Sequence, residues 1–124
     1  MATKLPSAGK ARSDSSVRVV VDEPAFLING AKLMGDYSSA LAIGDRWREA
    51  LQALGSNERL DGYNCLGVDD VGLNVSIPGC EINLHDCNLT NISTRPFVWS
   101  LSGIDLTFNG HGTTILDGGG SQQT

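Results

Sequence analysis

The sequence predicts a mostly β protein with one amphipathic helix. Residues 40–54 space their apolar side chains at steps of three and four, which is typical of a helix. Further along the chain, two similar stretches lie 22 residues apart, G-C-E-I-N-L ending at Leu84 and S-G-I-D-L ending at Leu106. This offset places Ile82 over Ile104. A repeat of this length lets parallel strands return the same inward positions to one layer, and it predicts the first rungs of a parallel β-helix.

The composition agrees with short strands joined by tight turns. The chain has 124 residues, enough for one domain or a small domain with an arm. It contains 15 glycines, and glycine and asparagine cluster in its second half, as expected for many turns. The alternative architecture is an ordinary antiparallel sandwich in which the two similar strands arise by chance.

Residues 1–16 are predicted to form a basic arm that is disordered or bound to a partner. This stretch has almost no large apolar side chains, so it cannot bury enough surface to fold alone. Residues 1–18 carry a net charge of +3, whereas residues 19–124 carry −8. The candidate partner-binding residues are Lys4, Lys10, Arg12 and Arg18. A solvated tail is the alternative, and a nucleic-acid partner is disfavoured because no aromatic residues lie between the basic ones.

Residues 17–37 are predicted to form a β-hairpin segment. Residues 17–21, V-R-V-V-V, are rich in β-branched side chains, and the apolar runs A-F-L-I and A-K-L-M flank Asn29-Gly30. Asn-Gly between apolar runs is a strong signal for a two-residue hairpin turn, because both turn positions need a positive φ.

Residues 38–55 are predicted to form the helix. Asp36, Ser38 and Ser39 are candidate N-caps, and Gly55 is a stop signal at the C-terminal end. Charged residues lie away from the apolar stripe, so one side of the helix should cover an apolar surface while the other meets water. The apolar stripe consists of Ala40, Ile43, Trp47, Ala50, Leu51 and Leu54.

Residues 56–124 are predicted to form β-helix-like rungs. Their brief apolar runs are separated by glycines and by Pro78-Gly79, which predicts strands of a few residues. Alternate residues of a strand point to opposite faces, so every second residue of these runs is assigned to the inside. The spacing of the expected strands along the chain fits three strands per rung. The expected inward residues are Leu73, Val75, Ile77, Ile82, Leu84, Ile104, Leu106, Phe108 and Ile115.

No set of residues identifies a reaction, so no catalytic residue is predicted. Glycoside hydrolysis needs two carboxylates that face each other. Asp69 and Asp70 are adjacent and favour a turn, and Asp105 lies between two inward positions and should face solvent. No spacing singles out a pair among Asp69, Asp70, Glu81, Asp86, Asp105 and Asp117.

Metal and cofactor sites are not predicted either. Alternation along one continuous strand places His85 and Cys87 on one face and Cys80 on the other, so the three cannot converge on a metal. His111 lies between two glycines and is interpreted as a turn residue. The odd number of cysteines argues against a disulfide framework, so Cys65, Cys80 and Cys87 are expected to be small buried apolar residues.

The N-terminus has no apolar run of the kind found in signal peptides, and the chain has no apolar stretch long enough to cross a membrane. The sequence therefore predicts a protein that is made and kept in a cytosol and has no membrane partner.

The order of these parts resembles the start of the pectin-lyase-like, right-handed β-helix tailspikes and depolymerases of bacteriophages. The matching stretches are G-A-K at 30–32, G-D at 35–36, A-L-Q-A-L ending at Leu54, I-P-G ending at Gly79, and G-H-G-T-T-I-L-D-G ending at Gly118. The spacing between G-D and the helix lacks the paired acidic residues that are common in that family. The resemblance implies that the helix precedes the first rungs.

A helix in that position has a physical purpose. An open stack of strands exposes apolar side chains and an unpaired edge, and an amphipathic helix laid across it would cover both. The candidate residues for this structural capping are Ile43, Trp47, Leu51 and Leu54.

The expected function is that of a phage virion structural protein, the particle-attaching N-terminal region of a trimeric tailspike or fibre. The expected partners are further copies of the chain and other virion proteins, namely a tail adaptor, the portal or the capsid. The expected location is the virion, after synthesis in the host cytoplasm. A small capsid decoration or cement protein is the first alternative. A fragment of a polysaccharide-cleaving enzyme is the second, because the resemblance includes such enzymes.

Overall fold

The computed structural model describes residues 22–92 and 99–117. In these residues the protein is mostly β-strand with one helix, as the sequence predicts. The predicted basic arm at 1–16 and the run at 17–21 lie outside the described residues. The elements are β1 (Ala25–Ile28), β2 (Ala31–Lys32), α2 (Ala40–Ala53), β3 (Arg59–Tyr63), β4 (Leu66–Asp69), β5 (Leu73–Ser76), β6 (Glu81–His85), β7 (Asn88–Asn91), β8 (Trp99–Ser102), β9 (Thr107–His111) and β10 (Ile115–Asp117).

The hairpin forms where Asn29-Gly30 predicts it. Strands β1 and β2 pair antiparallel, with Ile28 opposite Ala31. Asn29 has φ 50° and Gly30 has φ 86°, the two positive values that this turn requires. Strand β1 also pairs antiparallel with β3, and the sequence contains no signal for this contact.

The helix also forms as predicted. The Ser39 hydroxyl accepts a hydrogen bond from the Ala42 N–H at 3.1 Å, which satisfies one of the free donors at the helix start. At the other end, Leu54 has an extended backbone conformation and its N–H donates to the Ala50 carbonyl. Helix α2 therefore begins at a cap that the sequence predicts. Its end is at Leu54, and the predicted stop residue Gly55 does not have a positive φ.

The remaining strands form parallel pairs in three sheets. Strands β3, β6 and β9 lie side by side in that order, β7 lies between β4 and β10, and β5 pairs with β8. The chain visits the three sheets in the same order each time. We call β3–β4–β5 the first pass, β6–β7–β8 the second and β9–β10 the third. Parallel pairing excludes the antiparallel sandwich.

The passes are not all of the length that the sequence repeat suggests. Leu60 lies beside Ile82, a step of 22 residues, but Ile82 lies beside Phe108, a step of 26. The predicted placement of Ile82 over Ile104 is therefore wrong. Ile104 is 79% exposed and belongs to a turn, in which Asp105 has φ 60°. The triplet at 82–84 lies in strand β6, whereas the similar triplet at 104–106 lies in the turn before β9. The two do not pair because the chain between β7 and β9 is longer than the chain between β4 and β6.

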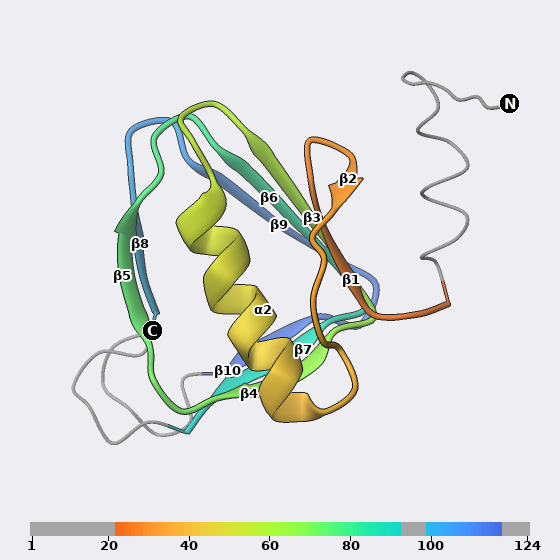
Figure 1. Ribbon diagram of the computed structural model, residues 1–124. Helices are drawn as coiled ribbons and strands as arrows, with labels where there is room; N and C mark the ends of the chain where they lie inside the picture. Colours follow the sequence, from red (N-terminus) through yellow and green to blue (C-terminus); the bar gives the residue numbers. More distant parts are fainter. Residues whose placement is uncertain (1–21, 93–98, 118–124) are drawn as a thin grey trace, which may run out of the picture.

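The core lies inside the outline formed by the three sheets, and α2 lies across this outline in Figure 1. The helix packs mainly against β4, β1 and β5. Its Gly44 touches the backbone of β4, since a Cβ there would overlap the Val68 carbonyl oxygen. The ring centroids of Phe26 and Trp47 lie 5.7 Å apart. Those of Trp47 and Trp99 lie 5.9 Å apart, with the two rings in an edge-to-face arrangement. These rings join the hairpin, the helix and the second pass.

The predicted inward positions fall into two groups. Ile77, Ile82 and Leu84 are buried, and Leu73, Val75 and Leu106 are partly buried against the same core. Ile104, Phe108 and Ile115 are exposed. The predicted inward direction is wrong for Ile104 and for Ile115, which lies in the same outward column as Leu66. Phe108 continues an inward column but has no strand beyond it among the described residues, whereas Ile104 lies in a turn.

Candidate functional site

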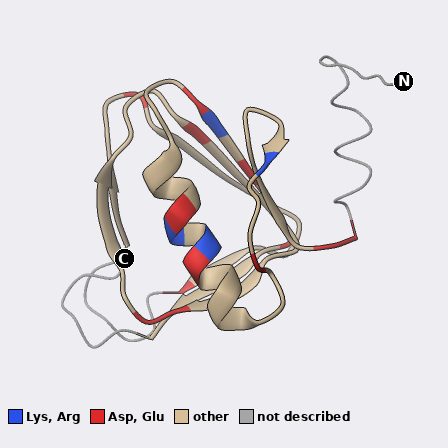
Figure 2. Ribbon diagram, in the orientation of Figure 1, with Lys and Arg blue, Asp and Glu red and all other residues tan. Residues whose placement is uncertain are grey.

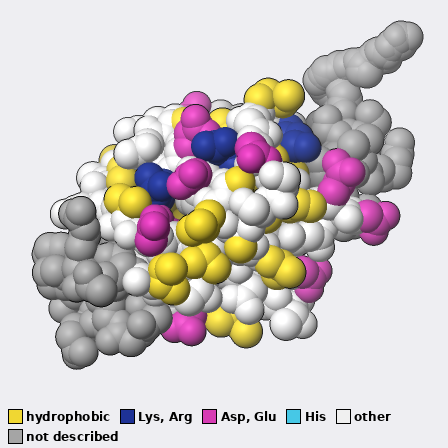
Figure 3. Space-filling model, turned by 60° about the horizontal axis from the view of Figure 1, so that its bottom comes forward, with side chains coloured by type: hydrophobic (Ala, Val, Ile, Leu, Met, Phe, Trp, Pro, Cys, Tyr) yellow, Lys and Arg dark blue, Asp and Glu magenta, His cyan; other side chains and the backbone are white. Residues whose placement is uncertain are grey.

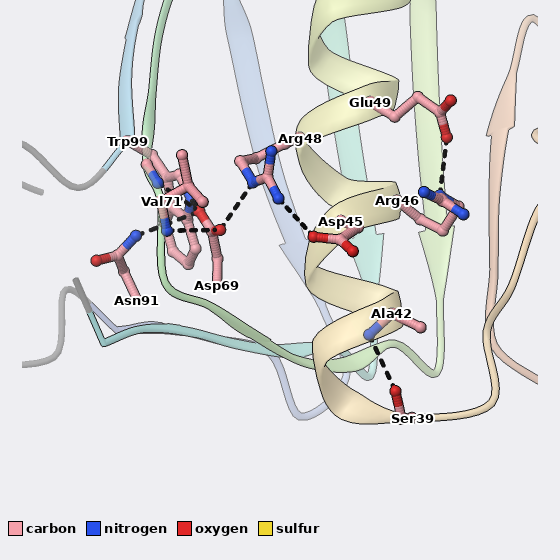
Figure 4. A network of polar contacts seen from close by, with 11 residues as sticks. Ser39, Ala42, Asp45, Arg46, Arg48, Glu49, Asp69, Val71, Asn91 and Trp99 are labelled. Atoms are coloured by element: carbon pink, nitrogen blue, oxygen red, sulfur yellow. Dashed lines mark hydrogen bonds and ion pairs between the residues drawn. The ribbon is translucent and has the colours of Figure 1, made fainter.

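Two groups of polar residues stand out, one buried beside the helix and one on an outer sheet face. The first is centred on Asp69, the last residue of β4, whose side chain is almost fully buried. Its carboxylate accepts hydrogen bonds from Arg48 Nε at 2.8 Å and from Trp99 Nε1 at 2.8 Å (Figure 4). It also accepts from the N–H groups of Val71 and Gly72 and from Asn91 Nδ2, at 3.1, 2.9 and 3.3 Å.

These bonds connect separate parts of the chain. Arg48 belongs to α2, Asn91 ends β7, and Trp99 begins β8. Arg48 also pairs with Asp45 one helical turn earlier (Figure 4). A buried carboxylate needs such donors, because it has lost its water. The predicted turn role of Asp69 is confirmed by its bonds to the turn backbone, but its bonds to the helix and the second pass were not predicted.

The second group lies on the outer face of the sheet β3–β6–β9. The register places three columns side by side across these strands, and alternation points them away from buried Leu60, Ile82 and Leu84. The columns are Arg59–Glu81–Thr107, Asp61–Asn83–Asn109 and Tyr63–His85–His111.

The third column is a stack of rings. Tyr63 and His85 lie 4.4 Å apart between centroids at an interplanar angle of 4°. His85 and His111 lie 4.5 Å apart at 11°. We call Tyr63, His85 and His111 the ring stack. Both faces of His85 are therefore covered by other rings.

The middle column carries the neighbouring polar groups. Asp61 is mostly buried and accepts from Arg59 Nε and Nη2 at 2.9 and 3.2 Å. Asp61 Oδ1 lies 3.7 Å from His85 Nε2, which is longer than a hydrogen bond. Asn83 accepts from Asn109 Nδ2 at 3.0 Å, and its oxygen lies 3.5 Å from His111 Nε2.

The surroundings shift the pKa values of three side chains on this face. Burial lowers the pKa of His85 below its ordinary value, and the neighbouring His111 lowers it further, while the Asp61 carboxylate acts in the opposite direction. Burial raises the pKa of Tyr63, and the Asp61 charge adds to this shift. The hydrogen bonds with Asp61 raise the pKa of Arg59, so this guanidinium stays charged.

The four predicted capping residues all lie in the core. Trp47 and Leu51 are fully buried, and Ile43 and Leu54 are nearly so. The predicted partner-binding residues, which are Lys4, Lys10, Arg12 and Arg18, lie outside the described residues.

The cysteines are free and buried, as predicted. The hydrogen bond with Cys87, together with burial, raises the pKa of Cys65, so this thiol stays protonated. The predicted placement of His85 and Cys87 on one face is wrong. Strand β6 ends at His85, and Asp86 has φ 54°, so the chain turns and Cys87 points into the core. Within residues 22–92 and 99–117, no three His, Cys, Asp or Glu residues are grouped to hold a metal ion.

The outer sheet face was largely missed from the sequence. His111 is the last residue of β9 and not the turn residue that its flanking glycines suggested. Strand β9 begins four residues later than a step of 22 residues places it. Asp105 is exposed as predicted, although it lies in a turn and not in a strand. The step of 22 residues between Tyr63 and His85 was a possible signal for the ring stack, but the following step is 26.

Comparisons with protein-family models, with curated proteins and with solved structures gave no match. The described part of the chain has no helix that is both long and apolar enough to cross a membrane. The function is therefore inferred from the geometry alone.

Proposed function

We propose that the chain is a phage virion structural protein, the particle-attaching N-terminal region of a trimeric tailspike or fibre. In this proposal the three passes are the first rungs of a parallel β-helix and α2 caps their near end. The observation that carries the proposal is the asymmetry of the strand stack. A helix lies across the first pass, while the strands of the third pass have exposed apolar side chains.

Several contacts support a capping role for α2. Its buried face contains Ile43, Trp47 and Leu51, and it packs on the strands of the first pass. Gly44 lets the helix backbone approach β4 closely. A helix bound this tightly hides apolar side chains that would otherwise promote aggregation at the start of the stack.

An exposed apolar face supports association between copies of the chain. Leu66 on β4 and Ile115 on β10 occupy one outward column of their sheet, and both are exposed. Leu41, at the start of α2, is exposed as well. Figure 3 shows hydrophobic side chains gathered across this side of the molecule, with charged groups around them. Three copies around an axis would cover such a face, because closed rotational symmetry buries the same patch on every chain.

The charge distribution supports a role for the arm. The described residues contain four Lys or Arg against thirteen Asp or Glu, and Figure 2 shows the acidic groups spread over many elements. A basic arm with Lys4, Lys10, Arg12 and Arg18 suits an acidic surface on an adaptor, portal or capsid protein or on a neighbouring copy.

Immunogold labelling of purified virions with antibodies against the 124-residue chain tests this proposal. Label at the tail is the expected result. Label spread over the capsid would instead support a decoration protein, and virions without label would contradict both assignments. Sedimentation of the isolated chain tests the trimer separately, and a stable monomer at micromolar concentration would contradict it.

Deletion of residues 1–16 tests the arm. The shortened chain should keep its fold and melting temperature, because the arm has too little apolar surface to support the core. It should load onto particles less well than the full chain. Charge-neutral replacement of Lys4, Lys10 and Arg12 by Gln is the matched variant. Full loading of both variants would show that attachment lies elsewhere.

A further inference from the structure

The sheet β3–β6–β9 ends at β9. In the described residues the strand order is β2–β1–β3–β6–β9, so β9 is held by β6 along one edge only. In the third pass, Phe108 lies beside buried Ile82 and Leu116 lies beside buried Leu89, yet both Phe108 and Leu116 are exposed. The third pass therefore has less apolar burial to hold it than the passes before it, and edge strands of this kind open locally at low cost.

A ring contact joins the third pass to the second on the outer face. His111 on β9 stacks on His85 of β6, and His85 stacks in turn on Tyr63 of β3. Stacked neutral rings attract each other, and cross-strand aromatic pairs stabilise the strands that carry them. Two imidazolium rings in the same place would repel, because their charges would lie face to face at a centroid separation of 4.5 Å.

We propose that His85 and His111 form an acid-sensitive clasp that holds β9 on β6 at neutral pH and releases it when both rings become protonated. This clasp does not depend on the proposed function.

The surrounding charges are too few to hold two imidazolium rings together. On β3 the Asp61 carboxylate lies 3.7 Å from His85 Nε2, which favours a first proton, but Arg59 already binds both carboxylate oxygens. On β6 the Glu81 carboxylate accepts from Asn83 Nδ2 at 2.9 Å.

The other neighbours do not change this balance. Asp86, which follows β6, accepts from the Thr113 N–H at 2.9 Å. Tyr63 on β3 is neutral near pH 7, since burial raises the pKa of its hydroxyl. On β9, Asn109 donates to Asn83 and carries no charge. One added proton has a carboxylate nearby, whereas a second has no free counter-ion among residues 22–92 and 99–117.

The direction of the pH effect follows from His85. Burial lowers the pKa of this ring in the closed stack, and His111 lowers it further. An opened strand removes His111 and exposes one face of the His85 ring, so the pKa of His85 moves back toward its ordinary value of about 6.5. The open state then takes up a proton where the closed state does not. The clasp is therefore fully effective above the ordinary value, and its contribution is lost as the pH falls below it.

The composition lets the protonation of this clasp be distinguished from that of other groups. The chain has two histidines, and both belong to the ring stack. Carboxylates titrate mainly at about pH 4, so a histidine signal between about pH 5 and 7 arises from this stack. Proton NMR of the imidazole C–H groups can follow protonation of the stack directly.

Hydrogen–deuterium exchange on the full 124-residue chain tests the clasp. Amide protection of Thr107–His111 is compared at about pH 7.5 and about pH 5.5, after correction for the intrinsic exchange rate. We expect protection in this strand to fall by about threefold at the lower pH, because the open state takes up a proton that the closed stack disfavours. Amides between β4 and β7, such as Asn88 N–H bonded to the Cys65 carbonyl, serve as the internal reference and should change less.

The matched variant is His111→Phe, which keeps a ring against His85 but cannot be charged. We expect it to fold normally and to lose most of the acid-induced opening of β9. His111→Gln, which has neither ring nor charge, should show weaker protection at both pH values. Equal protection of the parent strand at both pH values would refute the clasp, as would undiminished acid opening in His111→Phe.

Discussion

The second and third passes place apolar side chains in the same inward columns, yet they bury them very differently. Ile82 is fully buried and Leu89 is 1% exposed, whereas their neighbours in the third pass, Phe108 and Leu116, are 40% and 41% exposed. The side chains are of similar character, and the register is continuous. Burial in this fold therefore depends on having a neighbouring layer on both sides and not on the residue type.

The same comparison extends to the first pass, on which the helix packs. The first pass also lies at an end of the stack, yet Leu60 in this pass is fully buried. It has α2 and the hairpin strand β1 beside it, and the third pass has no equivalent among the described residues. In a stack of this kind, stability is close to a sum of nearest-neighbour contacts, so an uncovered layer is the weak one.

The largest effect is expected from Trp47→Ala. Trp47 is fully buried and contacts the rings of Phe26 and Trp99, so its truncation removes contacts on both sides of the helix. The free energy of unfolding should fall by about 3–5 kcal/mol, and aggregation should increase. Urea unfolding measures the loss. Gln52→Ala is the control, because Gln52 is exposed on the same helix, and an equal loss in both variants would contradict the assigned helix face.

Leu89→Ala and Leu116→Ala test the comparison between passes directly. The two residues are neighbours in one inward column. Leu89→Ala should lower the free energy of unfolding by about 2–4 kcal/mol, because it leaves a cavity. Leu116→Ala should cost less than about 1 kcal/mol, because that side chain is already partly in water. Similar losses in the two variants would show that a further layer covers the third pass in solution.

Asp69→Asn should cost about 1.5–3 kcal/mol, the range for losing hydrogen bonds to a buried charged group. The amide cannot accept from Arg48, Trp99 and the turn backbone as a carboxylate does. Thermal unfolding measures the loss. Asp70→Asn changes an exposed neighbour and is the matched control. A stable Asp69→Asn variant would mean that the network does not join the helix to the second pass.

The smallest effect is expected when the pH is lowered and the free energy of unfolding of the whole chain is measured. The pKa of His85 is lowered in the folded chain, so the unfolded chain binds the proton more tightly. Stability should be complete above about pH 6.5 and should decline as the pH falls below that value. Urea unfolding at several pH values measures the slope. His85→Phe keeps a stacked ring that cannot be charged, so its free energy of unfolding should depend less on pH. An increase in the stability of the parent chain as the pH falls would contradict the assigned direction.

Local signals were sufficient for the elements nearest the start of the described chain. The Asn29-Gly30 turn and the helix from Ala40 to Ala53 were predicted because each depends on neighbours in sequence. Turn residues need positive φ and a helix needs a cap and an apolar stripe, and both can be read within a few residues. The buried helix face was predicted for the same reason.

The register of the passes was only partly predictable. The step of 22 residues is correct between Leu60 and Ile82, and the similar triplet at Ile104 pointed to the wrong pair. The longer stretch between β7 and β9 changed the step, and a periodicity search has no means of locating such an insertion. His111 was interpreted as a turn residue because glycines flank it, so the ring stack was missed.

The sequence by itself determined which residues turn, which form the helix and that the rest forms short strands, because these properties depend on backbone preferences and local patterns. Only the tertiary structure decided which strands lie beside each other, which apolar side chains are covered and where the polar groups meet. Asp69, with its donors from α2, β7 and β8, and His85, with its rings from β3 and β9, are formed by residues about 20 to 30 positions apart. Contacts over such separations depend on the length of every connection between them, and no local preference encodes that length.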